Sequence, residues 1–469
     1  MNRKNEKQKN EVGQLELFDR ATGKPKMSNN GVTIVKALLG VELFSRLKEQ
    51  QTSTYQLLEK VIDYANLEKA YKQVRQNDGT SGIDKMTVDE LGRWLGKNVK
   101  VLCNDLLNES YEVQSVRKVE IDKPDGGKRT LGIPTVKDRL VQQAVHQELS
   151  KLYESQFSSG SFGFRPNRGA HDAIRQAKVY IEQGNEWVVD IDLEKFFDKI
   201  NHDRLMQRLS KGIGDKRILR LINKFLKAGL MSEGLEEQRV AGTPQGGPLS
   251  PILSNIVLDE MDKELEKRGH KFCRYADDCN IYVSSKNAAQ RVMESMIEFI
   301  EKKLKLKVNR EKSGVRHCSE VKFLGYTLLP EGGIRVADKS VERFKDKVRK
   351  ITKRNRGVKF EKLIAELNLL IIGWTNYFKL ANCWLSTMKD LDSWIRRKLR
   401  CYKLKQCCRR YSIFKFLRGF GIKESTSWNV VMYSQGWWKM SNKLAVKEAM
   451  NVKWFIDHGL HTLSNRIVR

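Results

Sequence analysis

The run Lys271–Val283, KFCRYADDCNIYV, constrains the fold of this chain more than any other segment. Apolar and polar residues alternate on both sides of Ala276, Asp277 and Asp278, which predicts two β-strands joined by a tight turn. Two carboxylates at such a turn suit hard divalent cations such as Mg²⁺, which prefer oxygen ligands. Aspartates at a hairpin tip are more often simply solvated, so a metal site needs a further carboxylate from elsewhere in the chain.

The composition points to an anionic partner. The chain has 469 residues with 87 Lys and Arg against 57 Asp and Glu, a formal charge of +30. Such an excess favours nucleic acid, and acidic membrane only second. No apolar run approaches the roughly 20 residues that cross a bilayer, and the charged start of the chain lacks the apolar core of a secretory signal. We therefore expect a cytoplasmic protein with no membrane partner. The eight cysteines show no zinc-ligand spacing, which indicates ordinary thiols.

Further strands and helices are predicted around the hairpin. Residues 119–134 read as two strands joined by a Pro-Asp-Gly-Gly turn, and residues 136–153 read as a helix. A buried strand begins within residues 186–197, a long helix covers about 287–304, and another strand follows at 321–328. This order indicates an α+β domain whose sheet carries the carboxylates.

A glycine-rich loop and a helix precede the hairpin. Ser250 is a typical N-cap residue, Pro251 suits the first helical position, and Gly269 suits the helix end. Leu253, Val257 and Met261 form an apolar stripe along one face of the helix between them.

The further carboxylate is expected in the segment VVDIDLEKFFD. Asp190 and Asp192 lie on the same face of a strand, so periodicity does not choose between them. Nucleotidyl transfer unites these features, because it uses two divalent ions held by carboxylates that converge from different strands. Val188, Val189 and Ile191 mark the strand as buried, where an unpaired carboxylate is costly and favours a cation.

The C-terminal third is basic and helical. Residues 341–410 hold 20 Lys and Arg against 6 Asp and Glu. Trp374, Tyr377 and Phe378 share one helical face, for which core packing is favoured over base stacking. Basic helices with interspersed aromatic residues suit a nucleic-acid partner.

Seven segments resemble, in order, the reverse-transcriptase blocks of bacterial group II intron-encoded proteins: KPDGGKRTLGIP, GFRPNRG, DIDLEKFFD, GTPQGGPLSPILSNI, YADD, LKVNREKS and VKFLGY. An eighth, LIIGWTNYFKL, resembles the maturase domain of that family. The resemblance covers roughly residues 52–400. It implies a right-hand polymerase with an α+β fingers–palm region and an antiparallel palm sheet, followed by an α-helical thumb/maturase domain and a small basic C-terminal segment.

On this basis we predict four regions. They are a partly disordered N-terminal extension (1–50), the fingers and palm (51–335), the thumb/maturase domain (336–400) and a DNA-binding segment (401–469). Many relatives add an HNH endonuclease after such a segment, and none is recognised here, so target cleavage by this chain is not expected.

The resemblance also assigns the site. It selects Asp192 as the metal ligand that joins Asp277 and Asp278 around two Mg²⁺ ions, with Mn²⁺ as a possible substitute, and it leaves Asp190 in a supporting role. Phe197, five residues after Asp192, resembles a steric gate against the ribose 2′-hydroxyl, with core packing as the alternative. The remaining predicted residues are Lys123, Arg129, Phe197 and Gln245 for nucleotide binding, Phe323, Leu324 and Gly325 for the primer grip, and Arg165, Arg396, Arg397 and Arg400 for RNA or template.

Two assignments stay open. Arg165 either touches template backbone or braces the fingers, and Lys312 matches a family position near the nucleotide site with a less certain role.

The function implied is that of an RNA-directed DNA polymerase encoded by a group II intron. It copies intron RNA into cDNA during retrohoming and assists folding and splicing of that RNA. Its partners are then intron RNA, an RNA template with a DNA primer, target DNA and deoxynucleoside triphosphates, with nucleoid association on target DNA. The alternatives are a splicing-only maturase and a reverse transcriptase domesticated for phage defence.

Overall fold

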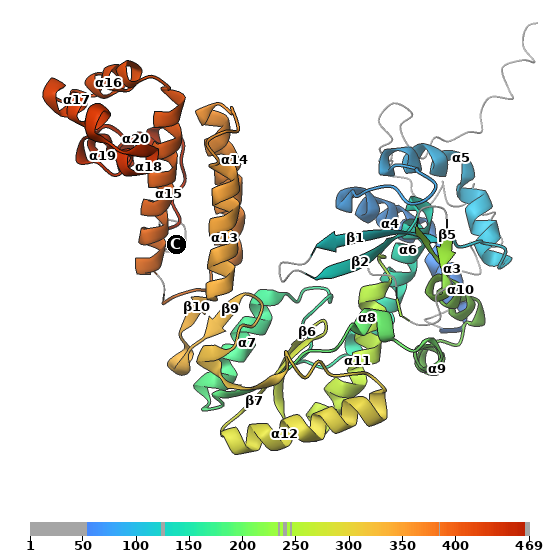
Figure 1. The fold of residues 1–469 in the computed structure, drawn as a ribbon. Helices are drawn as coiled ribbons and strands as arrows, with labels where there is room; N and C mark the ends of the chain where they lie inside the picture. The colour runs from blue at the N-terminus through green and yellow to red at the C-terminus, as the bar shows by residue number, and fades with distance from the viewer. Residues whose placement is uncertain are drawn as a thin grey trace, which may run out of the picture. The chain divides into compact units, whose positions relative to one another are not determined.

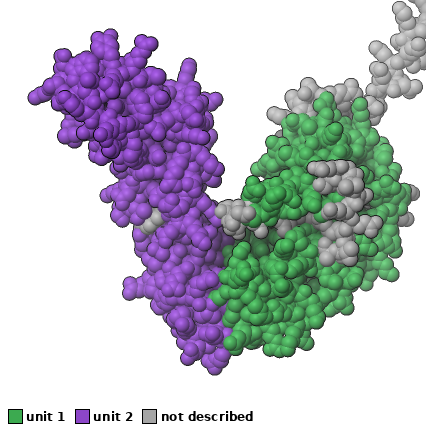
Figure 2. All heavy atoms as spheres, in the orientation of Figure 1, with its two compact units in different colours: residues 1–169, 191–279, 292–314 green, residues 170–190, 280–291, 315–469 purple. Residues whose placement is uncertain are grey.

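The computed structural model describes residues 54–122, 127–232, 235–237, 242–243, 246–383 and 385–464. The chain forms two compact units (Figure 2). Unit 1 consists of residues 1–169, 191–279 and 292–314, and unit 2 of residues 170–190, 280–291 and 315–469. The predicted extension at 1–50 lies outside the described residues.

Helices with strong start signals open unit 1. Asp63 separates α3 from α4 and caps the second of them by accepting the N–H of Ala65. Thr87 and Glu90 form a reciprocal capping box at the start of α5. Helix α6 is buried along most of its length and packs on α4. The bounds are η1 Thr54–Gln56, α3 Leu57–Ile62, α4 Tyr64–Asn77, α5 Val88–Leu107, α6 Val136–Tyr153 and η2 Glu154–Gln156.

The two strands predicted within residues 119–134 are confirmed. Strands β1 (Val116–Asp122) and β2 (Lys128–Ile133) pair antiparallel, with Ile121 opposite Arg129. Strand β4 (Leu230–Ser232) joins β1 in parallel, and β5 (Leu235–Glu237) pairs antiparallel with β4. The sheet order is therefore β2-β1-β4-β5, and β1 and β2 lie side by side in Figure 1.

A second four-stranded sheet carries the predicted carboxylates. Its order is β6-β7-β3-β8. The strands are β3 Trp187–Ile191, β6 Lys271–Tyr275, β7 Asp278–Val283 and β8 Gly314–His317. Only two residues separate β6 from β7, so these neighbouring strands form the predicted hairpin. Val188, Val189 and Ile191 are buried, as the apolar pattern of β3 predicted.

The remaining helices predicted in this region are present, but some of their ends differ from the prediction. The predicted N-cap is wrong by one residue: Leu249 is the N-cap and Ser250 is the first helical residue of α11. Gly269, with φ 71°, follows the C-terminal end of α11 as predicted. The predicted helix at 287–304 is α-helical only to Glu298, and its last six residues form a π-helix. The bounds are α8 Phe196–Lys199, α9 His202–Gly212, α10 Lys216–Lys227, α11 Ser250–Lys267, α12 Lys286–Glu298 and η3 Phe299–Leu304.

Unit 2 is mainly helical. Helices α13 and α14 pack side by side after the short β9–β10 hairpin (Figure 1). The predicted strand at 321–328 is only partly correct, because Leu324 and Gly325 form a turn and the strand begins at Tyr326. The bounds are α7 Ala170–Glu182, η4 Cys318–Glu320, β9 Tyr326–Leu328, η5 Pro330–Gly332, β10 Ile334–Val336, α13 Asp338–Ile351, α14 Phe360–Tyr377, α15 Leu385–Gln406, α16 Arg410–Arg418, α17 Glu424–Tyr433, α18 Gly436–Met440, α19 Leu444–Ala449 and α20 Val452–Asp457.

Throughout the described ranges, none of the helices combines the length and the apolar character that crossing a membrane requires.

Candidate active site and nucleic-acid interface

The turn of the β6–β7 hairpin places two carboxylates at one strand end. Tyr275 ends β6, Asp278 begins β7, and both Asp277 and Asp278 are half-buried. Ala276 has φ 59°, a left-handed conformation that lets the chain reverse within two residues. We call residues 275–278 the YADD turn.

Asp192 directly follows β3, the strand next to β7. Its backbone N–H donates to Ser313 Oγ at 2.9 Å, and its carbonyl accepts from the N–H of Asn309 at 2.8 Å. These contacts fix Asp192 against the loop 309–313, which also carries the exposed Lys312. The backbone of Asp192 is thus held while its side chain stays half-buried.

Asp190 has a different environment. Its carboxylate forms an ion pair with Arg316 of β8 at 3.2 Å. That pairing agrees with the supporting role that the family resemblance implies for Asp190.

The oxygen atoms of the three carboxylates are the type of ligand that hard divalent cations such as Mg²⁺ prefer. In the part of the chain that the structure describes, no group of three or more His, Cys, Asp or Glu side chains is close enough to hold a metal ion. Magnesium is usually bound by one or two carboxylates together with water and substrate phosphates, and seldom by an all-protein cage. The residues present therefore suit a site that the nucleotide completes.

Phe197 lies five residues after Asp192 and is half-buried, whereas its neighbour Phe196 is buried. The two rings meet edge to face with centroids 5.3 Å apart. The Phe197 carbonyl accepts the N–H of Thr243 at 2.7 Å, and a Cβ on Gly242 would lie 2.7 Å from that carbonyl. The glycine-rich loop thus approaches the Phe197 backbone at a position that tolerates no side chain.

The predicted nucleotide-binding residues of the fingers are only partly described. Arg129 is exposed on β2. Lys123 and Gln245 lie outside the described residues. Next to Gln245, a Cβ on Gly246 would lie 2.9 Å from the carbonyl of Gly132, so this loop also approaches the β2 backbone closely.

Arg165 is buried, and its guanidinium is occupied within unit 1. It forms a salt bridge with Glu154 at 2.8 Å and donates to the carbonyls of Ser158 and Ser161. This geometry favours the bracing alternative over a contact with template.

The predicted primer grip is a tight two-residue turn. Phe323 and Tyr326 exchange backbone hydrogen bonds of 2.9 Å across Leu324 and Gly325, which both have positive φ. Such a conformation is uncommon for leucine and needs support from its surroundings.

That support comes from the helical region. Tyr377 of α14 donates its hydroxyl to the Leu324 carbonyl at 2.9 Å, and Ser340 of α13 donates to the Gly325 carbonyl at 3.1 Å. A Cβ on Gly325 would lie 3.2 Å from the Phe378 ring. Phe378 is buried, as the predicted core packing requires, whereas Tyr377 is exposed, so that prediction is wrong for Tyr377. Both residues nevertheless contact the turn and hold it.

An open cavity of about 480 Å³ lies beside this turn in unit 2. Three exposed cations line it, together with the aromatic rings of α14. The lining includes Lys322, Arg343, Lys347, Trp374 and Tyr377. Cationic and aromatic groups around one open cavity suit a nucleic-acid strand.

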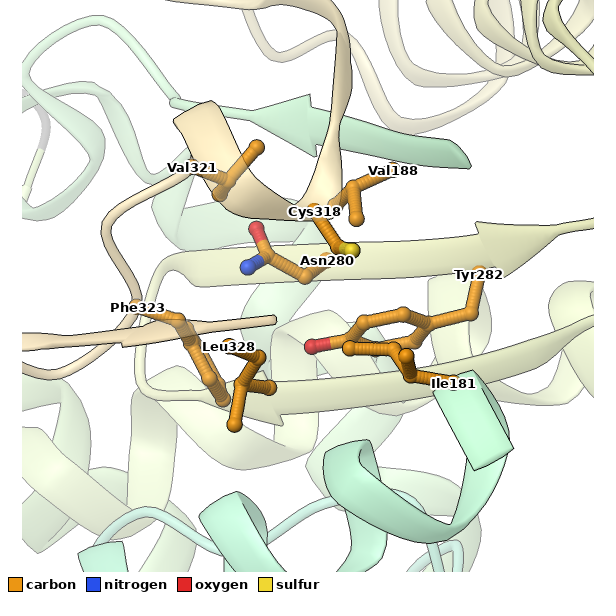
Figure 3. Close-up of a pocket in the computed structure, with 8 residues that line it drawn as sticks. All are labelled: Ile181, Val188, Asn280, Tyr282, Cys318, Val321, Phe323 and Leu328. Atoms are coloured by element: carbon orange, nitrogen blue, oxygen red, sulfur yellow. The ribbon is translucent and has the colours of Figure 1, made fainter. Parts of the chain in front are cut away.

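A second, small cavity is lined by Phe323 together with Asn280, Tyr282 and Cys318 (Figure 3). Its volume is about 10 Å³, which is room for about one water molecule. Asn280 of β7 is 1% exposed, and its side-chain oxygen has no hydrogen-bond partner among the residues that the structure describes. A buried water at this place would satisfy that oxygen.

The predicted RNA-binding arginines of α15 differ in exposure. Arg396 and Arg397 are half-buried. Arg400 is 7% exposed and donates its Nε–H to the carbonyl of Met450 at 2.9 Å. Its position suits the packing of α15 on the C-terminal helices better than direct contact with RNA.

Cations stacked on indole rings form a surface of which the sequence predicted only Arg397. We call Arg349, Trp394, Arg397, Lys398 and Trp438 the cation–indole ladder. Arg397 lies 3.8 Å above the Trp438 ring, and Lys398 lies 4.8 Å from Trp438 and 5.6 Å from Trp394. Burial lowers the pKa of the Lys398 ammonium, and neighbouring arginines lower it further. Crowded like charges of this kind favour a polyanionic partner.

Two protein families match the chain. "Reverse transcriptase (RNA-dependent DNA polymerase)" matches residues 121–328, and "Group II intron, maturase-specific domain" matches residues 341–417. Reverse transcriptases use divalent metal ions, and the two domains together imply binding of intron RNA and nucleic-acid substrates.

Curated relatives agree with these matches. Protein YkfC of Escherichia coli (strain K12) is 32% identical over 289 residues, which cover 53% of this chain and 76% of YkfC. Group II intron-encoded protein LtrA of Lactococcus lactis subsp. cremoris is 32% identical over 327 residues, or 55% of this chain and 54% of LtrA. The chain thus spans about half of LtrA. Among solved structures, a chain of a "Partial Cas6-RT-Cas1--Cas2 complex" is 23% identical with a TM-score of 0.34, over 52% of this chain and 42% of that chain.

The fold and the matched domains define a reverse transcriptase, which confirms the predicted α+β class with a helical C-terminal region. Within that class, the chain belongs to the family of group II intron-encoded reverse transcriptase/maturases, as its motifs predicted.

Proposed function

We propose that this chain copies intron RNA into DNA from a DNA primer during retrohoming, with deoxynucleoside triphosphates as substrates, and that it also assists splicing of the intron RNA. The observation that carries the proposal is the pairing of the YADD turn with Asp192, at the ends of two neighbouring strands of one sheet.

Asp192, Asp277 and Asp278 would hold the divalent ions, which we propose to be two Mg²⁺. Bound there, the ions would activate the primer 3′-hydroxyl and neutralise charge on the leaving pyrophosphate. The carboxylates contribute by keeping their geometry, which the fixed backbone of Asp192 supports.

Other residues act on the nucleotide and the primer. The half-buried Phe197 ring would crowd a ribose 2′-hydroxyl. Lys123 and Arg129 would neutralise the triphosphate, and positioned cations of this kind are a general requirement of phosphoryl transfer. Gln245 and its glycine neighbours would lie against the new base pair, and the Leu324–Gly325 turn would support the primer strand.

The maturase activity would use the basic surface of unit 2. The cation–indole ladder presents positive charge beside flat rings, which suits RNA phosphates and unpaired bases. We propose that the C-terminal residues from 401 contact target DNA, and that the protein works in the cytoplasm, on the nucleoid when bound to its target.

Primer extension on an RNA template with Mg²⁺ tests the polymerase assignment. Asp277→Ala should lower the single-turnover rate by at least about 100-fold, because a charge-stabilising group at the reacting centre is lost. Asp203→Ala, an exposed carboxylate in the first turn of α9, is the matched control and should extend like the wild type. Equal rates for all three proteins would exclude the assignment and leave the splicing-only alternative.

A further inference from the structure

Arg274, the fourth residue of β6, is a fully buried cation one residue before the YADD turn. Its side chain is 0% exposed. A buried guanidinium is costly unless it is paired and every donor is satisfied. Asp262 of α11, also 0% exposed, provides the counter-charge.

Every N–H of this guanidinium has an acceptor. Nε and Nη2 donate to the two carboxylate oxygens of Asp262 at 2.7 and 2.6 Å. The second Nη2 donor reaches Ser161 Oγ at 2.8 Å, and Nη1 donates to Asn255 Oδ1 at 3.0 Å. The last donor of Nη1 reaches the Ala276 carbonyl at 2.8 Å. An arginine has five such donors, so the set is complete.

The Ala276 carbonyl is the acceptor that connects this network to the chemistry. It belongs to the same planar peptide group as the N–H of Asp277. Fixing the orientation of this carbonyl therefore fixes the orientation of the Asp277 N–H as well. Ala276 is buried and has φ 59°, a left-handed conformation that is unfavourable for a residue other than glycine. The turn therefore needs a partner that holds it.

The loop at Gly163 also contacts the turn. A Cβ on Gly163 would lie 2.3 Å from the Ala276 nitrogen, so the loop backbone touches the turn directly. Asn255, already bonded to Arg274, donates its Nδ2–H to the Gly163 carbonyl at 2.8 Å. The same buried amide thus joins the loop to the arginine.

We propose that Arg274 is a positioning residue for catalysis: with Asp262 and Asn255 it fixes the Ala276–Asp277 peptide and so aims the Asp277 carboxylate. This inference rests on the proposed polymerase function. A buried ion pair often adds little stability over apolar packing of the same volume, so stability alone does not explain this arrangement.

Arg274→Lys tests the proposal, because it keeps the charge but loses the planar fork that reaches four partners. We expect kcat for nucleotide addition to fall by about 100-fold, as displacement by about 1 Å from reacting geometry does, with little change in the nucleotide KM or in the Kd for primer–template. Hydrogen exchange of the peptide spanning residues 272–280, measured without metal or nucleic acid, should become faster.

Arg208→Lys is the matched control. Arg208 of α9 donates to the carbonyls of Ile256 and Val257 on the same helix α11, and in the described part of the chain no hydrogen bond or ion pair joins Arg208 to the YADD turn. It should leave both kcat and the exchange at residues 272–280 unchanged. Asp277→Ala should lose activity with wild-type exchange, which separates failure of the polymerase assignment from failure of the positioning role.

Gly163→Ala provides a second approach in case Arg274→Lys does not fold. It displaces the turn while the Arg274–Asp262 pair stays intact, and it should lower kcat and speed exchange in the same way. Wild-type kcat and wild-type exchange in whichever variant folds would overturn the proposal. So would an equal loss of kcat in Arg208→Lys, since that result would indicate a general packing effect.

Discussion

Ser313 Oγ accepts the backbone N–H of Asp192 at 2.9 Å, although 121 residues separate the two in the chain. The hydroxyl is buried with its residue and connects the loop 309–313 to the end of β3. One of the three predicted metal ligands is thus held by the last residue of LKVNREKS, a motif far from Asp192 in the sequence.

Ser313→Ala should therefore slow nucleotide addition. Loss of one neutral hydrogen bond costs about 1 kcal/mol, and leaving the Asp192 N–H unpaired adds to it, so we expect a fall of about 10-fold in kcat. Single-turnover extension measures this, with Ser210→Ala on the exposed side of α9 as the control. A wild-type rate for Ser313→Ala would show that Asp192 does not need this contact.

Phe197→Ala should relax discrimination against ribonucleotides. The half-buried ring is lost, while the Phe197 carbonyl still accepts from Thr243, so the loop stays in place. We expect the ratio of kcat/KM for deoxy- over ribonucleotide to fall by about 100-fold. Phe196→Leu, at the buried neighbour, should lower thermal stability and leave the ratio unchanged; an unchanged ratio in Phe197→Ala would favour the core-packing alternative.

Tyr377→Phe should weaken support of the primer grip. It removes only the hydroxyl that donates to the Leu324 carbonyl, a bond worth about 1 kcal/mol. Extension at limiting primer–template should drop by about fivefold and recover at saturating primer–template. A loss that persists at saturation would place the defect in chemistry and not in primer binding.

The cation–indole ladder predicts a salt-dependent RNA contact. Lys398→Ala and Trp438→Ala should each raise the Kd for intron RNA, and the lysine variant should reduce the salt slope by about one. Extension of a short annealed primer–template should not change. Binding that stays at the wild-type Kd in both variants would remove the ladder from the RNA interface.

Asp138 gives a pH dependence of stability. Burial raises the pKa of its carboxyl to about 6, although Thr135, Tyr111 and Gln114 donate hydrogen bonds to it. The folded state therefore holds this proton more tightly than the unfolded chain, whose reference value is 3.8. Protonated Asp138 therefore stabilises the folded state below pH about 4, and this stabilisation is lost as the pH rises through about 6.

Asp138→Asn removes that titration. The variant should gain up to about 3 kcal/mol of unfolding free energy relative to wild type between pH 4 and pH 7. Denaturant unfolding at both pH values measures the difference. A relative loss over the same range would mean that the three donors lower the pKa instead.

Local patterns predicted much of the fold. The YADD hairpin, the fingers hairpin, α6 and the α11 end at Gly269 all follow from signals within about twenty residues. The turn at Leu324 was not predicted, because leucine rarely adopts positive φ and the contacts that hold it come from Ser340 and Tyr377.

The sequence predicted which types of residue form the site, but it predicted only part of how these residues are arranged. Alternation left Asp190 and Asp192 equivalent, and only the family resemblance chose between them. The structure distinguishes them by partners far along the chain: Arg316 for Asp190 and Ser313 for Asp192. The Arg274 network was likewise invisible in sequence, because Ser161 and Asp262 lie 113 and 12 residues from it.

The most direct test of the central claim measures two activities of one variant. Asp277→Ala, shown by circular dichroism to be folded, is assayed for primer extension on an RNA template and for assistance of intron splicing. We predict that extension is lost while splicing assistance keeps its wild-type level, because the first needs carboxylate chemistry and the second needs binding surface. Extension equal to wild type would contradict the account.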